Sequence, residues 1–145
     1  MELSLKGKKI LITGAGAGIG LACAEAFVTA GADVAICDVE QARLDDALAT
    51  LTSIGGNHYG QLCDVASADA VADFFANSVK ALGSLDIVLN NAGVGSPLVP
   101  LEETDEADYD GSWASISRGS GSACARVSRS CRLQAPGTSS TWPRR

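Results

Sequence analysis

The chain has 145 residues and a formal net charge of −6, but its charges divide at Asp110. Residues 1–110 hold all 17 acidic residues and five of the 11 basic ones, whereas residues 111–145 hold six Arg and neither an acid nor a Lys. No apolar run approaches the roughly 20 residues that span a membrane, and no secretory leader is recognisable. The composition argues against a membrane protein and predicts a cytoplasmic one, with a folded domain over 1–110 and a disordered tail over 111–145.

Short apolar runs alternate with segments of helical periodicity through the acidic part of the chain. The predicted strands are 8–13, 33–38, 59–63 and 85–90, and the predicted helices are 19–30, 40–51 and 67–82. Strands that alternate with helices pair in parallel, because each helix is the crossover between two strands. Right-handed crossovers then place successive strands outward on one side. The pattern predicts an α/β fold, a Rossmann-like doubly wound parallel sheet truncated to about four strands.

Each predicted helix carries apolar residues at helical spacing, which indicates the face that packs on the sheet. These residues are Ile19, Ala22, Cys23, Ala26, Phe27 and Ala30 in the first helix, Leu44, Ala47, Leu48 and Leu51 in the second, and Val71, Phe74, Phe75, Val79 and Leu82 in the third.

A glycine-rich run, Thr13 to Gly20, joins the first predicted strand to the first helix. Gly14 can turn tightly off the strand, Gly18 leaves room for a pyrophosphate, and Gly20 allows the helix to pack closely on the sheet. The helix that starts near Ile19 offers free N–H groups and a positive dipole end to phosphate. We therefore predict dinucleotide binding here; a flexible turn is the alternative. The run lacks the Gly-Lys-Ser/Thr ending of a nucleoside-triphosphate loop.

Asp38 ends the second predicted strand, 24 residues after Gly14. A carboxylate at this point accepts hydrogen bonds from the adenosine ribose hydroxyls and repels a 2′-phosphate. The position therefore favours NAD over NADP, with a solvated acid at a strand end as the alternative. Arg43 lies farther on, in the next helix, and is not expected to replace Asp38.

Polar and small residues also follow the third and fourth predicted strands. The ligand of a doubly wound sheet lies at the carboxyl ends of its strands. Asp64 and Val65 are expected beside the adenine, unless Asp64 is only a helix cap. Asn90, Ala92 and Gly93 are expected to let the chain pass beside the cofactor, although turn chemistry also selects Asn and Gly.

The remaining titratable and sulfur-bearing residues give no sign of a metal site. His58 stands alone among glycines and is predicted to lie in a surface loop. Cys23, Cys37 and Cys63 fall in apolar periodic segments and are predicted to be buried free thiols. No Cys-x-x-Cys pair or Cys/His cluster is present, so we assign no metal ligand.

Together these motifs resemble the short-chain dehydrogenase/reductase family. The resemblance rests on Thr13-Gly14-x-x-x-Gly18-x-Gly20, Asp38, Asp64-Val65 and Asn90-Asn91-Ala92-Gly93, in that order, and covers residues 5–110, about half of such a protein. It implies a one-domain Rossmann fold that binds NAD(P) and interconverts alcohols and carbonyls. In the family an Asn, a Ser and a Tyr-x-x-x-Lys pair carry catalysis.

The catalytic pair of the family has no counterpart in this chain. Its two tyrosines, Tyr59 and Tyr109, are followed four residues later by Cys63 and Trp113, and the last Lys is Lys80. The family mechanism needs a Tyr phenol as general acid/base with its pKa lowered by a nearby ammonium. No catalytic residue is therefore assigned, and the chain is expected to be inactive.

The basic tail has an explanation in the genetic code. If the nucleotides of codons 111–124 are read starting one base earlier, permitted synonymous codons can encode an apolar helix. This helix is similar to the one that carries the family's active-site Asn. Residues 137–144 can likewise encode the strand that leads to the family's catalytic Ser. We hypothesise a one-base deletion near codons 110–111; a genuine Arg/Ser tail that binds acidic partners is the alternative.

Three functions stay open at this point: an oxidoreductase by descent, a nucleotide-binding pseudoenzyme, and a non-functional fragment. The expected partner is a dinucleotide, and neither nucleic acid nor a membrane is expected. The sequence selects no substrate and no oligomeric state.

Overall fold

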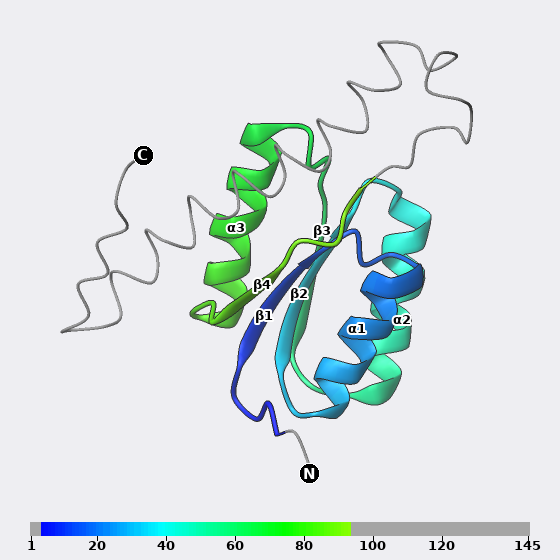
Figure 1. Ribbon diagram of the computed structural model, residues 1–145, viewed down its shortest axis with the longest axis vertical. Coiled ribbons are helices and arrows are strands. Elements are labelled where there is room, and N and C mark those ends of the chain that lie inside the picture. The colour runs from blue at the N-terminus through cyan, green and yellow to red at the C-terminus, as the bar shows by residue number, and fades with distance from the viewer. Residues whose placement is uncertain (1–3, 94–145) are drawn as a thin grey trace, which may run out of the picture.

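The computed structural model describes residues 4–93, which form alternating strands and helices (Figure 1). The seven elements confirm the predicted order, with bounds that differ by up to three residues. They are β1 (Lys9–Thr13), α1 (Gly18–Thr29), β2 (Asp33–Asp38), α2 (Gln41–Ile54), β3 (His58–Leu62), α3 (Ala68–Leu82) and β4 (Ile87–Leu89).

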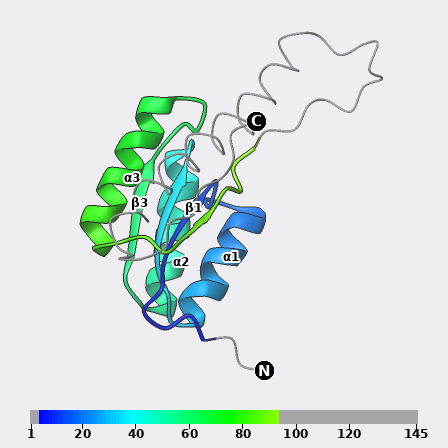
Figure 2. The same cartoon turned by 60° about the vertical axis from the view of Figure 1, so that its left-hand side comes forward.

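All strand pairs are parallel, and the strand order is β3-β2-β1-β4. The prediction that successive strands move outward on one side holds for β1, β2 and β3 and is wrong for β4, which returns to the other side of β1. Reversing direction while keeping crossovers right-handed requires the crossover helix to change face. Accordingly α1 and α2 cover one face of the sheet and α3 covers the other, which confirms the doubly wound fold (Figure 2).

Two apolar cores lie on the two faces of the sheet. The β1 and β2 side chains alternate between them: Ile10 and Ile36 face the core under α1 and α2, whereas Leu11 and Cys37 face the core under α3. A strand buried on both faces is apolar at nearly every position, because no position meets water. This accounts for the uninterrupted apolar runs from which the sequence predicted the strands.

The buried faces of α2 and α3 follow the predicted spacing, but that of α1 does not. The fully buried positions of α1 are Gly20, Ala24 and Val28. Ile19, Ala22 and Ala26, all assigned to the buried face from the sequence, are exposed. The segment is apolar nearly all round, so periodicity alone cannot select its buried side. A glycine faces the sheet instead, because the backbones approach there too closely for a side chain.

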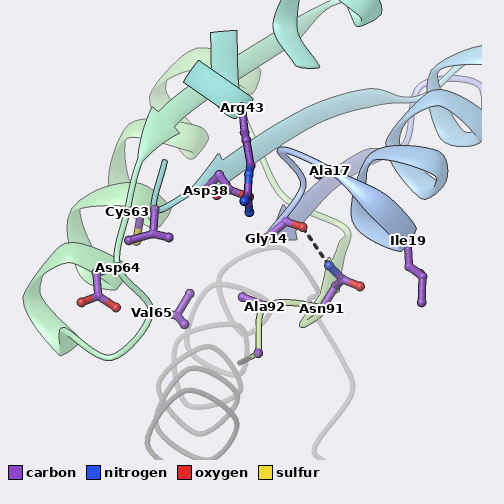
Figure 3. Close-up of a pocket in the computed structure, with 12 residues that line it drawn as sticks. Gly14, Ala17, Ile19, Asp38, Arg43, Cys63, Asp64, Val65, Asn91 and Ala92 are labelled. Carbon is purple, nitrogen blue, oxygen red and sulfur yellow. Dashed lines mark hydrogen bonds between the residues drawn. The ribbon is translucent and has the colours of Figure 1, made fainter. Parts of the chain in front are cut away.

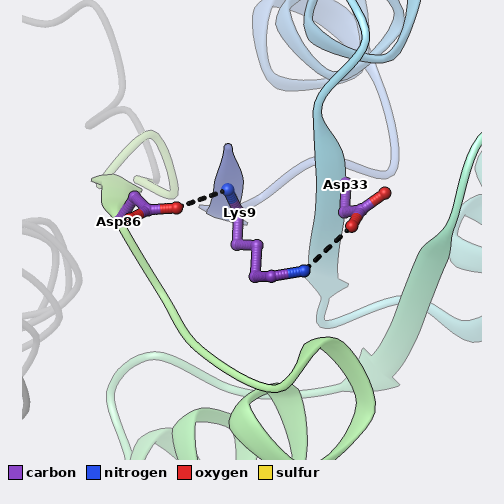
Figure 4. Close-up of polar contacts among 3 residues, drawn as sticks. All are labelled: Lys9, Asp33 and Asp86. Atoms are coloured by element: carbon purple, nitrogen blue, oxygen red, sulfur yellow. Dashed lines mark hydrogen bonds and ion pairs between the residues drawn. The ribbon is translucent and has the colours of Figure 1, made fainter. Parts of the chain in front are cut away.

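A set of polar contacts joins three strands at the end of the sheet opposite the glycine-rich run (Figure 4). The Lys9 ammonium lies 3.0 Å from Asp33 Oδ2 at the start of β2. The Lys9 backbone N–H donates to Asp86 Oδ2 at 2.9 Å, and the Asp86 N–H donates to the Lys9 carbonyl at 2.8 Å. Asp86 thereby sets the register at which β4 joins β1.

His58 is not in a surface loop, as the sequence suggested, but is the first residue of β3. Its ring is part-buried: Nε2 lies 3.0 Å from the Thr52 hydroxyl, and Nδ1 is buried without a partner among the described residues. The glycines that suggested a loop, Gly55 and Gly56, have positive φ and form the turn just before the strand.

The predicted boundary at Asp110 and the tail 111–145 lie outside the described residues. Among residues 4–93, none of the three helices combines the length and the hydropathy of a membrane span. No cluster of three or more potential metal-ligating His, Cys, Asp or Glu side chains occurs in this part of the chain either.

The largest fully buried side chain, Phe74 on α3, provides a test of the second core. We expect Phe74→Ala to lower the free energy of unfolding by about 3–5 kcal/mol, because it removes apolar contacts and leaves a cavity. Urea denaturation followed by circular dichroism measures the change. The matched variant Asp73→Ala, at the exposed position just before it on the same helix, should stay within about 0.5 kcal/mol of wild type. Equal effects of the two changes would contradict this packing.

Candidate cofactor-binding site

A cavity of about 430 Å³ opens where the chain leaves the carboxyl ends of all four strands (Figure 3). A cavity of this size can take a substantial part of an organic cofactor. It is lined by Gly14, Ala17, Ile19, Asp38, Val39, Arg43, Cys63, Asp64, Val65, Asn91, Ala92 and Gly93. The reversal of strand order between β1 and β4 forms this crevice, since the connections after the two strands diverge there.

The cavity floor is a close contact between the glycine-rich run and the segment after β4. Gly14 has φ +64°, and a Cβ built on it would lie 2.7 Å from the Ala92 Cα. A Cβ on Gly20 would overlap the Gly14 carbonyl oxygen and the Asn91 amide. Both positions therefore require glycine, as the sequence predicted for a tight turn at Gly14 and close packing at Gly20.

Asn91 connects these backbones through its side-chain amide. Its Nδ2 donates to the Thr13 carbonyl at 3.2 Å and to the Gly14 carbonyl at 2.9 Å (Figure 3). In return, Thr13 Oγ1 accepts the N–H groups of Asn91 and Ala92, each at 3.1 Å. The loop carbonyls and the post-strand N–H groups thus find their hydrogen-bond partners across this contact.

Asp38 lies in the cavity wall with only 8% of its surface exposed. Its Oδ2 accepts the Gly16 N–H at 2.9 Å, and its Oδ1 accepts the Glu40 N–H at 3.2 Å. A carboxylate has about four acceptor positions, so about two stay open. The carboxylate therefore holds the glycine-rich loop and can still receive two hydroxyl groups.

The start of α1 carries the features of an anion site. Its N-cap is Ala17, whose side chain cannot cap the first-turn N–H groups, and the first turn has no acidic residue. Gly18 has φ +58°, and a Cβ added there would meet nothing within 4 Å. The Ile19 side chain is 75% exposed and lies at the edge of the cavity. Uncapped N–H groups at a positive dipole end favour a phosphate.

Asp64 and Val65 form the wall beyond β3, where the sequence placed them. Asp64 Oδ1 accepts the N–H of Ala66 at 2.9 Å and so closes a turn. The alternative of a helix cap at Asp64 is wrong, because Ser67 is the N-cap of α3 and accepts the Ala70 N–H at 3.3 Å.

The structure brings seven of the ten predicted site residues to the cavity lining and leaves out Gly18, Gly20 and Asn90. Gly18 and Gly20 contribute through backbone shape. Asn90 is exposed, and its neighbour Asn91 lines the cavity.

Arg43, which the sequence analysis placed in the next helix and did not include among the site residues, also lines the cavity. The helix begins only at Gln41, so Arg43 is still in its first turn and lies beside Asp38 (Figure 3). Its Nε pairs with Glu40 Oε2 at 2.8 Å, and more than half of each side chain is exposed. The other lining residues missed from the sequence are Ala17, Val39, Cys63 and Asn91. Val39 and Arg43 follow Asp38 by one and five residues, and this closeness in the sequence was the available signal for them.

Comparison with known proteins identifies the architecture. The family model described as short chain dehydrogenase matches residues 8–135, most of the chain. The chain belongs to the short-chain dehydrogenase/reductase family. Members of this oxidoreductase family bind a nicotinamide dinucleotide. The match to the family continues past Asp110, where the charge distribution changes.

Relatives within the short-chain dehydrogenase/reductase family differ in the substrates that their names state. The 7alpha-hydroxysteroid dehydrogenase of Escherichia coli K12 is 41% identical over 99 residues, which are 66% of this chain and 38% of the relative. The D-threitol dehydrogenase of Mycolicibacterium smegmatis is 40% identical over 114 residues, 78% of this chain and 43% of the relative.

A solved structure, NAD+-bound xylitol dehydrogenase, superposes with a TM-score of 0.87 at 30% identity and covers 91% of this chain and 51% of that one. The chain therefore spans about half of the solved relative and about two fifths of the two curated ones.

The amide bridge of Asn91 can be tested against its exposed neighbour. Asn91→Ala should lower the free energy of unfolding by about 1–3 kcal/mol, because two part-buried carbonyls lose their donor. Asn90→Ala is the matched control and should change stability by less than about 0.5 kcal/mol. Urea titrations of both variants give the comparison. A loss for Asn90→Ala as large as that for Asn91→Ala would show that the amide bridge does not hold the loop.

Proposed function

We propose that the cavity binds NAD in preference to NADP. The observation that carries the proposal is the buried Asp38 carboxylate, which lines the cavity and has about two acceptor positions beyond those used by Gly16 and Glu40. Two neighbouring ribose hydroxyls would fill these positions, whereas a 2′-phosphate would meet a buried negative charge. The crystal structure of the xylitol dehydrogenase relative, whose title states that NAD+ is bound, supports the class of ligand.

The other lining residues suggest how the dinucleotide would be held. The pyrophosphate would lie on the backbone of Gly14, Gly18, Ile19 and Gly20, where first-turn N–H groups are uncapped. Asp64 and Val65 would flank the adenine. Ala92 and Gly93 would let the chain pass beside the rest of the cofactor, and Asn91, in place of the predicted Asn90, anchors the loop backbone. When bound, the nicotinamide ring supplies the hydride acceptor or donor.

Arg43 is the only cation that lines the cavity within the described part of the chain, and it bears on the choice between the two dinucleotides. Its guanidinium would favour a 2′-phosphate if it were free to turn toward one. It is paired with Glu40, but an exposed pair of this kind contributes only about 0–1 kcal/mol. The buried Asp38 is the stronger influence, because a charge with low exposure is screened less by water and salt.

We further propose that this 145-residue chain does not catalyse turnover, since it has no Tyr-x-x-x-Lys pair. The change from an acidic to an acid-free composition at Asp110 supports a shifted reading frame as the origin of the tail. A cytoplasmic location is part of the same proposal. The substrate differs among the relatives, so none of their substrates is assigned to this chain.

Isothermal titration with NAD and NADP tests the role of Asp38. We expect NAD to bind more tightly than NADP. Asp38→Ala should weaken the binding of NAD about 10–100-fold, because it removes hydrogen bonds to a charged acceptor. The affinity for NADP should fall less, because the substitution also removes the repulsion between the carboxylate and the 2′-phosphate.

The matched control is Asp33→Ala, at the opposite end of β2, where the carboxylate pairs with Lys9. It should leave NAD affinity within about twofold, since this part-buried ion pair lies at the end of the sheet opposite the cavity. Circular dichroism must show that Asp38→Ala keeps the fold, because Gly16 also depends on this carboxylate. Tighter binding of NADP than of NAD by the wild-type chain would overturn the proposal.

The proposed inactivity is tested by incubating the chain with NAD and secondary alcohols, including a 7α-hydroxysteroid, threitol and xylitol. We expect no NADH above the rate without protein, because no phenol–ammonium pair is available to take the substrate proton. Formation of NADH in proportion to protein concentration would contradict it.

The gene supplies the second measurement. Restoring one base near codon 111 should open a longer frame with a Tyr-x-x-x-Lys downstream, and the protein from that frame is the positive control for turnover. A restored frame that stops early or lacks this pair would refute the frameshift.

A further inference from the structure

Two cysteines, one in β2 and one directly after β3, belong to the core beneath α3, and the second, Cys63, also lines the cavity. Cys37 belongs to β2, and its β3 partner in the parallel register is Gln61. Cys63 lies two residues farther along, so its side chain is on the same side of the sheet as that of Cys37. The Cys63 N–H donates to the Asp38 carbonyl at 2.9 Å, which holds the two chain segments together. Both side chains belong to the core beneath α3.

The two thiols differ in access and in chemistry. Cys37 is fully buried, whereas Cys63, at 3% exposure, lines the cavity (Figure 3). The neighbouring Cys37 thiol lowers the pKa of Cys63, although burial and Asp64 oppose the shift. The same interaction with Cys63, together with burial, raises the pKa of Cys37. The accessible sulfur is therefore the better nucleophile, and the enclosed one keeps its proton.

We propose that Cys63, in the cavity wall, is a peroxide-reactive thiol and that Cys37, in the core behind it, is its resolving partner, so that the two form a dithiol site. The substrate class is a small hydroperoxide, of which hydrogen peroxide is the simplest. Such a molecule is uncharged and small enough to reach Cys63 through the cavity.

The chemistry balances in two steps. The Cys63 thiolate attacks one peroxide oxygen; the S–O bond forms, the O–O bond breaks, and hydroxide leaves, giving a sulfenic acid. The Cys37 sulfur then attacks the Cys63 sulfur; the S–S bond forms, the S–O bond breaks, and the Cys37 proton leaves with the hydroxyl group as water. Two thiols lose two electrons in total, and one peroxide gains them.

The position of Cys63 indicates which part of the structure yields when the bond forms. Bonded sulfurs are about 2.05 Å apart, and diagonal positions on neighbouring strands lie about 7–8 Å apart, so one segment has to move. Cys37 is in β2, held between β1 and β3, whereas Cys63 begins the turn that continues into Asp64 and Val65. Oxidation would therefore draw this turn toward β2. Any effect on dinucleotide affinity rests on the proposed function, but the dithiol chemistry does not.

Peptide mapping of the full chain after treatment with hydrogen peroxide tests the proposal. We expect a disulfide-linked peptide pair containing Cys37 and Cys63, formed at least about tenfold faster than oxidation of Cys23, because Cys63 has a lowered pKa and shares its core with a second thiol. Cys23, part-buried on α1, is the internal control. Mapping resolves the pair from the other three cysteines of the chain.

Single substitutions assign the two roles. In Cys37→Ser, Cys63 should stop at the sulfenic acid, which dimedone traps. In Cys63→Ser, Cys37 should stay reduced. Oxidation and mapping of the wild-type chain in denaturant give a test that needs no folded variant. There the preferential formation of the disulfide between Cys37 and Cys63 should disappear. The proposal is overturned if both thiols survive in the folded chain while Cys23 oxidises, if Cys63→Ser leaves Cys37 reactive, or if the preference persists after unfolding.

Discussion

The contact between the glycine-rich run and the segment after β4 is the constraint on which the cavity depends. At this point β1, α1 and the chain beyond β4 approach so closely that Gly14 and Gly20 leave no room for a Cβ. The Asn91 amide then connects the carbonyls of Thr13 and Gly14, which would otherwise be left without donors. Because buried carbonyls without partners are costly, the amide fixes how far apart the two segments can lie. That spacing sets the width of the crevice between them.

The strand order makes this contact possible. β4 lies next to β1 and not next to β3, so the first and last described strands end side by side. At the other end of the sheet, Asp86 brackets the Lys9 backbone and sets the register of the pair. Residues separated by more than 70 positions in the sequence are thereby brought within hydrogen-bond distance at both ends of β1.

The sequence predicted the elements and most of the site because parallel strands with two buried faces, and glycines at a tight turn, leave strong local patterns. It could not select the buried side of α1, since apolar residues occupy nearly every direction around that helix. It chose Asn90 over Asn91 for a related reason: only the backbone path after β4 decides which amide turns inward. The position of Arg43 at the cavity depended on how the chain turns between Asp38 and the start of α2 at Gln41, which no local pattern reveals. The meeting of Cys37 and Cys63 depended on the register of β2 and β3, which no local pattern reveals.

The double use of Asp38 has a consequence for how such a site can change over time. One carboxylate oxygen secures the Gly16 N–H of the loop, and the same group is the one that we propose discriminates between ligands. On that proposal, a lineage that replaced Asp38 to accept a phosphorylated cofactor would also release a loop restraint. A second change that supplies another acceptor for Gly16 would have to come with it or before it. The proposed preference for one ligand would then change slowly in evolution, because the same residue also maintains the shape of the loop.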